Sequence, residues 1–315
     1  MTSRVEEIDA RIAPDDVLSR FAAIEHRTWH EQAPGEPLRT TDEVIAFYRH
    51  QPTTHASCHW LADGAMAALY VHGPTAAFVN VSVVPELRRR GMGRALLERT
   101  LERARDLGVR ALHAHHSTRA GAAFAARHGF RDGQRVVRSL LDLPAAELSP
   151  PAAPDGWTLV TWLGRVPDEH LASFVTARAA MDDAPSADDL EFPTWTAATV
   201  RASEESLALR NRELRVTVAI RPDGEIGAFT ELRVSRGSTL GFTDDTGTVV
   251  AHRRRGLARA VKLESLRRLR DDHPEITVVT TSNAEENTAM RRVNERAGFR
   301  PSAVETTATL DLSVS

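Results

Sequence analysis

A pattern of seventeen residues occurs twice in this chain, at Val81–Leu97 and again at Thr246–Lys262. Each copy begins with a run rich in β-branched residues and continues with three consecutive arginines. Two small residues follow, with one residue between them. After these, apolar residues recur at the spacing of an amphipathic helix. Such a sequence predicts a β-strand that turns tightly into an α-helix, and it predicts this arrangement twice.

The small residues of the two turns are Gly91 and Gly93 in the first copy and Gly256 and Ala258 in the second. Where a strand enters a helix through such a turn, several backbone N–H groups lack partners and point toward one place. That place suits phosphate oxygens, and a small residue lets an anion approach the backbone. We therefore expect an anion site at each turn.

A second landmark follows each turn. The dipeptide Gly-Phe occurs at 129–130 and at 298–299, 169 positions apart, while Gly91 and Gly256 are 165 positions apart. A single glycine turn is common in unrelated proteins, whereas two landmarks in the same order at nearly the same offset indicate a duplicated domain. A chain of 315 residues is long enough for two domains with separate cores.

Both turns fit R-x-x-G-x-[GA], and with the Gly-Phe pairs the chain resembles the GCN5-related N-acetyltransferase (GNAT) family. The resemblance implies an α/β fold of two tandem GNAT-like domains, each a mixed, mostly antiparallel, splayed sheet flanked by helices. We expect an N-terminal domain over residues 1–148, a Pro- and Ala-rich linker over 149–155 and a C-terminal domain over 156–315. The segments Val136–Leu143 and Val304–Leu312 are each expected to close the sheet of their own domain.

The fourth strands are expected at Ala76–Val84 and Phe242–Ala251, and the fifth strands at Val109–His116 and Ile276–Thr281. In the family these two strands run parallel and separate at the middle of the sheet. The family's fourth strand also carries a β-bulge that turns its backbone toward the thioester. The sequence itself contains no sign of a bulge.

Composition excludes several classes of protein. A net charge of −3 provides no broad basic face for nucleic acid, and no apolar run is long enough to cross a membrane. All basic residues except Lys262 are arginines, as codon usage in a G+C-rich genome would give. The single cysteine, Cys58, cannot form an internal disulfide, and the N-terminus lacks the apolar core of a signal peptide. We expect a cytoplasmic protein, monomeric or homodimeric, without nucleic-acid or membrane partners.

The resemblance implies that acetyl-CoA is the co-substrate, that each turn holds its pyrophosphate, and that no metal takes part. The residues expected at the first coenzyme turn are Val83, Val84, Arg88, Arg89, Arg90, Gly91, Met92, Gly93 and Arg94. Those expected at the second turn are Val249, Val250, Arg253, Arg254, Arg255, Gly256, Leu257, Ala258 and Arg259, with Asn283 and Asn287 beside the coenzyme arm.

Acetyl transfer needs a base or a water chain that takes the proton of the attacking amine, and an acid for the departing thiolate. The family's usual acid is a tyrosine four residues before the glycine of the Gly-Phe pair. Here those positions hold Ala125 and Asn294, and the two tyrosines, Tyr48 and Tyr70, lie elsewhere. Alanine cannot donate a proton, whereas the amide of Asn294 can hydrogen-bond the sulfur without protonating it.

The second copy carries the richer set of polar residues. Its segment 282–299 resembles a bacterial GNAT subgroup with the pattern N-A-x-x-N-x-x-M-x-x-V-N-x-x-x-G-F. The resemblance places Asn283 and Asn287 near the coenzyme arm and Asn294 near the sulfur. The alternative for Asn283 is that its side chain caps the following helix.

Candidate bases come from the strands that line the substrate side in the family, namely Glu231, Asp244 and Asp245. Each can instead be a solvated carboxylate at the end of a strand, and a water relay without a dedicated base fits the sequence equally well. We take Asn294, Asp245 and Glu231 as the candidate catalytic residues.

Three histidines, His113, His115 and His116, lie on the fifth strand of the first copy. Alternating histidines on a strand can bind a metal, but no further ligand at matching spacing joins them. We expect a solvated or substrate-lining cluster.

Together these features predict acetyl transfer from acetyl-CoA to an amine of a small molecule by direct attack, with catalysis mainly in the C-terminal domain. The first copy keeps both glycines of its turn and is expected to bind coenzyme or to support the structure. One alternative is a non-catalytic acyl-CoA-binding or sensing protein, which the missing tyrosines suggest. The other is a protein N-acetyltransferase, because a fold does not fix the acceptor.

Overall fold

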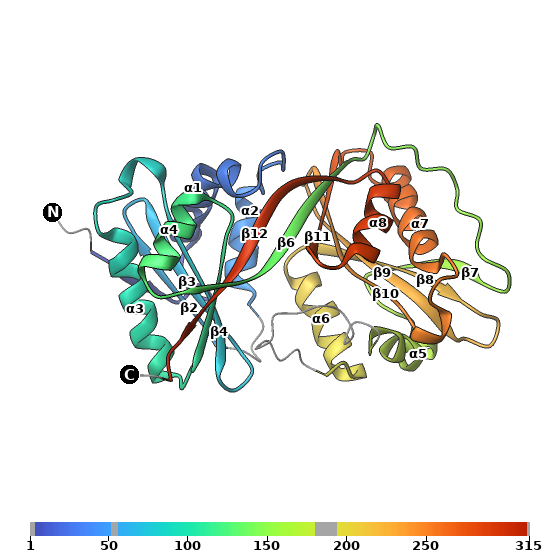
Figure 1. The fold of residues 1–315 in the computed structure, drawn as a ribbon, viewed down its shortest axis with the longest axis horizontal. Coiled ribbons are helices and arrows are strands. Elements are labelled where there is room, and N and C mark those ends of the chain that lie inside the picture. The colour runs from blue at the N-terminus through green and yellow to red at the C-terminus, as the bar shows by residue number, and fades with distance from the viewer. Residues whose placement is uncertain (1–3, 52–55, 180–193, 314–315) are drawn as a thin grey trace. The chain divides into compact units, whose positions relative to one another are not determined.

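The computed structural model describes residues 4–51, 56–179 and 194–313, which fall into two compact units. The first unit contains the described residues up to Val136 together with those from Ala303 onward. The second contains the described residues from Val137 to Ser302. Figure 1 shows the helices and strands of both.

The sheet of the first unit is mostly antiparallel. Its strands follow the order β1 (Glu6–Ile8), β2 (Ser57–Ala62), β3 (Ala65–His72), β4 (Ala76–Val83), β5 (Ala111–His116) and β12 (Arg300–Asp311). The neighbours β4 and β5 run parallel and pair over three positions, from Ala76 opposite Ala111 to Phe78 opposite His113. Beyond these positions the two strands separate, as the splayed sheet requires.

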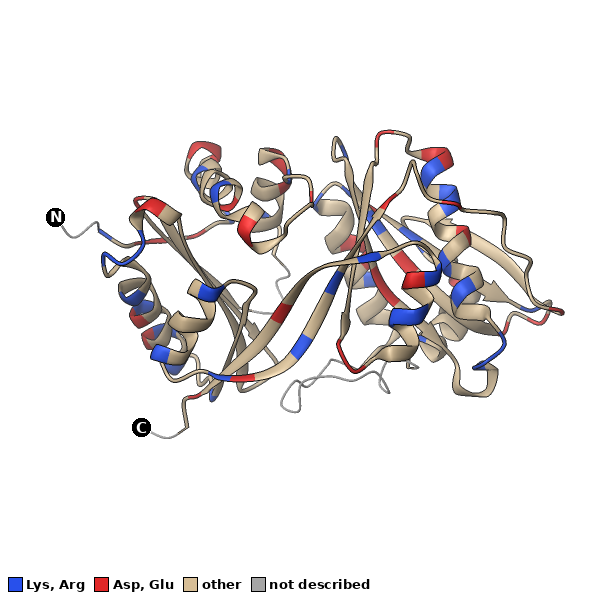
Figure 2. Ribbon diagram, turned by 45° about the horizontal axis from the view of Figure 1, so that its top comes forward, with Lys and Arg blue, Asp and Glu red and all other residues tan. Residues whose placement is uncertain are grey.

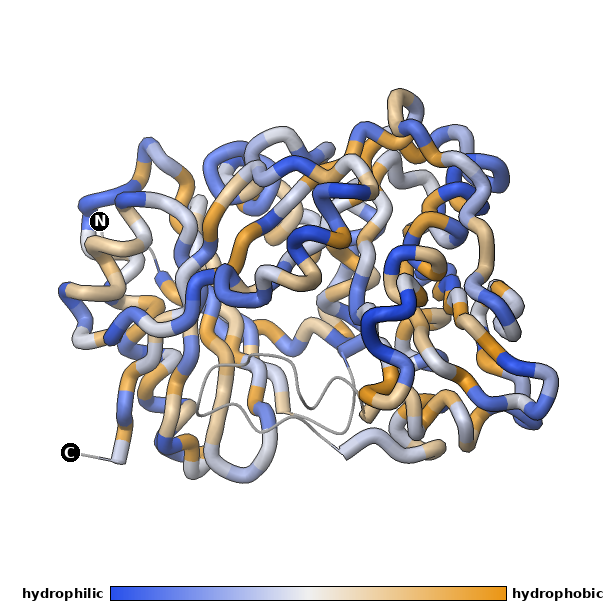
Figure 3. The backbone as a smooth tube through the Cα atoms, turned by 45° about the vertical axis from the view of Figure 1, so that its right-hand side comes forward, coloured by the Kyte–Doolittle hydropathy of each residue, from blue (hydrophilic) through white to orange (hydrophobic). Residues whose placement is uncertain are grey.

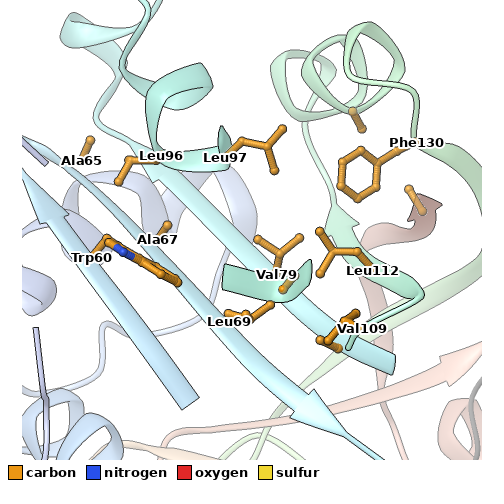
Figure 4. Close-up of a cluster of buried hydrophobic side chains, with 14 of the residues drawn as sticks. Trp60, Ala65, Ala67, Leu69, Val79, Leu96, Leu97, Val109, Leu112 and Phe130 are labelled. Atoms are coloured by element: carbon orange, nitrogen blue, oxygen red, sulfur yellow. The ribbon is translucent and has the colours of Figure 1, made fainter. Parts of the chain in front are cut away.

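Helices cover both faces of this sheet. They are α1 (Asp15–Gln32), α2 (Thr41–Arg49), α3 (Met92–Asp106) and α4 (Arg119–Arg127). Successive side chains of β2 point to opposite faces of the sheet. Leu61 packs in one core with Phe21 of α1, and Trp60 packs in another with Leu97 of α3. Figure 4 shows the second of these cores, with Leu97 and Phe130 among its side chains.

The second unit repeats this plan. Its strands follow the order β6 (Arg131–Asp142), β11 (Val278–Ala284), β10 (Leu240–Thr248), β9 (Ile226–Ser235), β8 (Arg212–Ile220) and β7 (Thr158–Leu163). Its helices are α5 (Asp168–Arg178), α6 (Ala197–Leu209), α7 (Leu257–Asp272) and α8 (Thr288–Arg296). The strands β10 and β11 run parallel over three positions, from Leu240 opposite Val278 to Phe242 opposite Thr280. The expected α/β fold with two mixed, mostly antiparallel sheets flanked by helices is confirmed.

The closing strands differ from the expectation. β12 comes from the second copy in sequence, yet it pairs with β5 of the first unit, from Thr306 opposite His116 to Asp311 opposite Ala111. The part of β6 from Val137 onward belongs in turn to the second unit. The expectation that each closing strand completes its own copy's sheet was therefore wrong. Both strands alternate with the same period, so the sequence pattern does not say which sheet edge either one joins. The continuous limits 1–148 and 156–315, with a linker at 149–155, stay a prediction.

Charge and hydropathy are distributed as in an ordinary globular protein. Hydrophobic and hydrophilic residues are interspersed along the chain, as the tube in Figure 3 shows. Basic and acidic residues share the helices of each unit (Figure 2), as where Arg94 Nε donates to Glu98 Oε1 at 2.7 Å on α3. Within the described residues, no helix is both long and apolar enough to cross a membrane.

Candidate functional site

The first turn has the geometry that the repeated pattern predicts. Gly91 caps α3 from the left-handed region, with φ of +86°, and no atom lies within 4 Å of the place where its Cβ would stand. The helix ladder begins where the N–H of Ala95 donates to the Gly91 carbonyl oxygen at 3.0 Å. The N–H groups of residues 92–94 therefore precede the ladder, as donors for an anion at the helix N-terminus do.

The second turn has the same local structure. Gly256 caps α7 with φ of +79°, again with open space at its Cβ position. The N–H of Ala260 donates to the Gly256 carbonyl oxygen at 3.0 Å. The arginine three residues before each glycine makes the same hydrogen bond in both turns. Arg88 Nε donates to the Val83 carbonyl oxygen at 3.0 Å, and Arg253 Nε donates to the Thr248 carbonyl oxygen at 3.3 Å.

The second small residue of the first turn serves helix packing. A Cβ on Gly93 would lie 3.2 Å from the ring of Phe124 on α4, a tight approach. Ala258 carries a Cβ at the same place in α7, and no phenylalanine of α8 stands opposite it. In the first turn, Gly91 thus shapes the backbone and Gly93 permits the close approach of α4.

The two units differ at their fourth strands. In the second unit, Thr243 pairs with Leu232 of β9 but Thr246 pairs with Thr230, so that Asp244 and Asp245 together face one residue. This is a β-bulge, and it turns local backbone groups out of the ladder. In the first unit, β4 pairs with β3 without a register shift from Ala65 opposite Val83 to His72 opposite Ala76.

A buried arginine connects the polar residues around this bulge. Arg178 at the end of α5 is 4% exposed and forms ion pairs with Glu231 of β9 and with Asp245, whose Oδ2 lies 2.7 Å from Arg178 Nη2. Its guanidinium carbon lies 3.5 Å from the centre of the Trp195 ring. The structure therefore brings together Glu231 and Asp245, two of the residues expected from the sequence. Asp244 pairs separately with Arg233 at 2.7 Å.

Burial changes the proton affinity of the carboxylates in this cluster. It raises the pKa of Glu231 to about 7; the Arg178 guanidinium opposes this shift, and the Asp245 carboxylate adds to it. Burial also raises the pKa of Asp244, against the opposing charge of Arg233. A carboxyl group whose pKa lies near neutrality can take up and release a proton at physiological pH.

The third expected residue, Asn294, lies in a second polar group. It is 3% exposed on α8, and its Nδ2 donates to Oδ1 of Asn283 on β11 at 2.5 Å. Its Oδ1 is buried and has no hydrogen-bond partner. The residue that caps α8 is Asn287, whose side chain accepts from the N–H of Met290 at 3.1 Å. The alternative role of Asn283 as the helix cap is therefore wrong.

The first unit lacks this amide pair. The offset of 169 residues matches Asn283 with Ala114 and Asn294 with Ala125. It also matches Asn287 with Thr118, which caps α4 by accepting from the N–H of Gly121. The cap is thus common to both units, whereas the pair of asparagines is present in the second alone.

Histidines of β5 lie within hydrogen-bond distance of other side chains of the first unit. His113 is fully buried with its Nδ1 3.0 Å from the Thr309 hydroxyl of β12, and Nε2 of His116 lies 2.8 Å from Asp132. Among the residues that the structure describes, no group of three or more His, Cys, Asp or Glu side chains is arranged to hold a metal ion.

Sequence reasoning missed three residues of the second unit: Arg178, Trp195 and Lys262. Arg178 is one of many arginines and Trp195 stands alone before α6, so neither belongs to a recognisable pattern. Lys262 is the one lysine of the chain and is 1% exposed. Its rarity was a usable signal, because a lysine at a position of helical core spacing contradicts the binary pattern.

The chain is similar to known acetyltransferases. Residues 6–130 match the model of the acetyltransferase (GNAT) family. The mycothiol acetyltransferase of Salinispora arenicola is 30% identical over 297 residues, which cover 92% of this chain and 87% of that protein. The mycothiol acetyltransferase of Nocardia farcinica is 28% identical over 265 residues, covering 79% of this chain and 82% of that protein.

Solved structures share the fold over the full length. A tandem GNAT protein from the clavulanic acid biosynthesis pathway, solved without AcCoA, superposes with a TM-score of 0.85 at 24% identity and covers 99% of this chain and all of that chain. A GCN5-related N-acetyltransferase from Sphaerobacter thermophilus superposes with a TM-score of 0.69 at 18% identity, covering 98% and 95% of the two chains.

Proposed function

This chain belongs to the GNAT family of acetyltransferases, and from that premise we propose that its second unit transfers the acetyl group of acetyl-CoA to a primary amine of a small molecule by direct attack. The observation that carries the proposal is the β-bulge at Asp244–Asp245, which β4 of the first unit lacks. A bulge frees backbone N–H groups in the middle of the sheet, where an oxyanion developing on the thioester carbonyl needs donors.

The coenzyme fits the turn before α7. The N–H groups of Leu257, Ala258 and Arg259 precede the helix ladder, and the open space at the Gly256 Cβ position leaves room for a pyrophosphate. The pairing of β10 with β11 ends at Phe242 and Thr280, before the bulge, and the coenzyme arm is proposed to run between the two strands from the turn toward the bulge. When bound, acetyl-CoA supplies the activated acetyl group.

Glu231 is the proposed base. Its pKa of about 7 means that a large fraction is ionised at neutral pH and can take a proton from the attacking amine, directly or through one water. Arg178 holds Glu231 and Asp245 in position and keeps the pKa of Glu231 from rising further. Asp245 and Asp244 add negative charge that favours a cationic amine at the site.

Asn294 is proposed to support the departing sulfur from α8. Its Nδ2 is engaged by Asn283, and the atom that lacks a partner is Oδ1, which is an acceptor. An acceptor does not stabilise a thiolate by itself, so we assign Asn294 the role of orienting a proton donor. The first unit, with Ala114 and Ala125 at these places, is proposed to bind coenzyme at its turn without transferring acetyl groups.

The acceptor is proposed to be a small molecule with a primary amine. This assignment draws on the relatives, which are named as mycothiol acetyltransferases, and on the carboxylates around the bulge. A protein amine and a pure coenzyme sensor remain as the two competing outcomes of the test below.

The test compares Gly256→Val with Gly91→Val, which place the same β-branched residue in the same left-handed backbone with open space around both. Acetyl transfer to a panel of small amines is followed by coenzyme release and by mass spectrometry, and folding is checked by thermal melting. We expect Gly256→Val to lose most of the transfer and Gly91→Val to keep most of it.

If Gly91→Val is the inactive variant, catalysis lies in the first unit. Equal partial losses would mean two working sites, and coenzyme binding without transfer to any amine or protein would indicate a sensor.

A further inference from the structure

The single lysine of the chain is buried against an aromatic ring. The Lys262 side chain lies on α7, is 1% exposed, and places its Nζ 5.1 Å from the centre of the Phe299 ring. Among the described residues, no charged side chain acts on the pKa of this amine. Burying an amine in this way costs free energy, so a chain keeps it only where something compensates for the cost.

The fold does not need a lysine at this position. Lys262 follows the turn glycine Gly256 by six residues, and Leu97 follows Gly91 by the same number. Leu97 is 1% exposed and shares an apolar core with Phe130, as Figure 4 shows. In the second unit, the corresponding phenylalanine is Phe299, and an amine stands where the first unit has a leucine.

A buried polar group belongs to the residue that Phe299 contacts through its backbone. The backbone N–H of Phe299 donates to the Asn294 carbonyl oxygen at 3.0 Å, and the side-chain Oδ1 of Asn294 is buried without a partner. Phe299 is therefore in contact with both residues, with Lys262 through its ring and with Asn294 through its backbone. At the three matching positions the second unit has Asn283, Asn294 and Lys262, whereas the first unit has only alanine and leucine: Ala114, Ala125 and Leu97.

Lys262 lies on α7, the helix that follows the proposed coenzyme turn at Gly256. At 1.5 Å of rise per residue, Lys262 lies roughly 9 Å along α7 from Gly256. The coenzyme arm is proposed to run from that turn toward the bulge at Asp244–Asp245, and Lys262 lies on the helix that begins at the same turn. The expected tyrosine acid is missing at position 294, and Asn294 cannot replace its proton.

We propose that Lys262 is the proton donor to the coenzyme thiolate that departs when the second unit transfers an acetyl group, with the Asn294 Oδ1 orienting its ammonium group. This inference rests on the function proposed above. As the amine nitrogen of the acceptor bonds to the acetyl carbon, the carbon–sulfur bond breaks and its electron pair goes to the sulfur. Lys262 gives one proton to the sulfur and becomes neutral; the acceptor nitrogen loses one proton to Glu231 or water; solvent returns a proton to Lys262.

The protonation of Lys262 suits this role. Burial alone lowers the pKa of Lys262 to about 7, and no charged side chain of the described residues contributes to the shift. The nearest acid along its own helix, Glu264, is held by Arg267 and Arg268. A group with its pKa near neutrality can give up its proton during a cycle and regain it before the next.

The kinetic test uses Lys262→Leu, which installs the residue of the first unit, with Leu97→Met as the matched control. An acid must carry its proton, so kcat of the wild type should fall as the pH rises through the pKa of Lys262. We expect Lys262→Leu to lose about a hundredfold in kcat and to lose this falling limb, with little change in KM for acetyl-CoA.

Lys262→Arg should not restore the rate, because a guanidinium does not release its proton. The thermal midpoint of Lys262→Leu should not drop, which separates this loss from a folding defect. A Lys262→Leu variant with the wild-type kcat and pH profile would overturn the inference.

A second measurement is independent of turnover. Because Lys262 is the one lysine, protein labelled with [ε-13C]lysine gives a single side-chain NMR signal that titrates without assignment. We expect a midpoint near 7, raised when coenzyme A is bound and unchanged by desulfo-coenzyme A, which lacks the sulfur. A midpoint near 10.5, or the same response to both ligands, would overturn the inference even if the enzyme is active. If no amine is acetylated but the signal behaves as expected, the proposed function fails while the position of Lys262 beside the sulfur stands.

Discussion

At the scale of single residues, Asn294 separates the two units most clearly. It takes the place of an acid that the family usually provides, and its hydrogen bond to Asn283 fixes its orientation. Removing it leaves Asn283 without its partner and removes the acceptor that we assign to Lys262.

Asn294→Ala should therefore lower kcat more than it raises KM for acetyl-CoA. A hydrogen bond to a charged group contributes about 1.5–3 kcal/mol, which corresponds to about a ten- to hundredfold loss of rate. Steady-state kinetics at several pH values would also show a displaced falling limb, since Lys262 loses its orienting oxygen. A merely structural asparagine would leave the pH profile as it is, and wild-type kcat in this variant would contradict the assignment.

Glu231 sets the opposite limb of the pH profile. Its pKa of about 7 lies above the usual value for a glutamic acid, so as the pH falls through 7 the carboxylate is protonated and cannot act as a base. We expect the rate of the wild type to rise with pH with a midpoint near 7, and Glu231→Gln to lose this rise together with most of its activity. A Glu231→Gln variant that keeps the rising limb would favour a water relay.

The same shift has a consequence for stability, with the sign opposite to that of an ordinary carboxylate. Between the unfolded pKa of 4.5 and the folded value of about 7, the folded state binds more protons than the unfolded state. The contribution of Glu231 to stability is therefore fully present below pH 4.5 and is lost as the pH rises through 7. Thermal melts of Glu231→Gln and wild type across this range should converge at low pH and diverge above pH 7.

At the scale of elements, the β-bulge of β10 is the feature that the sequence did not reveal. Its residues Asp244 and Asp245 read as two acidic positions in a strand, and no residue type marks the insertion. The turns were predictable because glycine in a left-handed conformation leaves a signature, whereas a bulge depends on the register with β9, which lies elsewhere in the sequence.

Deleting Asp244 should convert β10 into a regular strand like β4. The remaining residues of β10 can keep their register with β9, so the fold should persist while the freed backbone donors disappear. We expect acetyl-CoA to bind with nearly unchanged affinity by calorimetry and turnover to fall about a hundred- to thousandfold, the usual effect of losing an oxyanion donor. Unchanged turnover in a folded deletion variant would show that the bulge has no part in catalysis.

At the scale of the whole molecule, the repeated pattern predicted two similar sheets but not how they share strands. Thr306–Asp311 of β12 pairs with β5, although it follows the second copy in sequence. Short-range patterns such as turns and core periodicity were readable because they depend on neighbours along the chain. The exchange of closing strands and the ion pairs of Arg178 depend on contacts between distant segments, which a single sequence does not encode in any local pattern.

The exchange predicts an unusual response to truncation. Removing residues 303–315 should expose the edge of β5, because β12 covers it over six paired positions. Hydrogen exchange should then accelerate in Ala111–His116 of the first unit, while β11 in the second unit keeps its protection. Faster exchange confined to β11 would contradict the observed pairing.

The central claim is that the second unit performs the transfer because its fourth strand is bulged, and a crystal structure with acetyl-CoA tests it most directly. We predict pyrophosphate at the turn before α7 and a thioester carbonyl oxygen within about 3 Å of a backbone N–H in the segment Asp244–Thr246. In the first unit, the coenzyme should occupy the turn at most, with no such contact to β4. An acetyl group bound against β4, with the turn at Gly256 empty, would contradict the account.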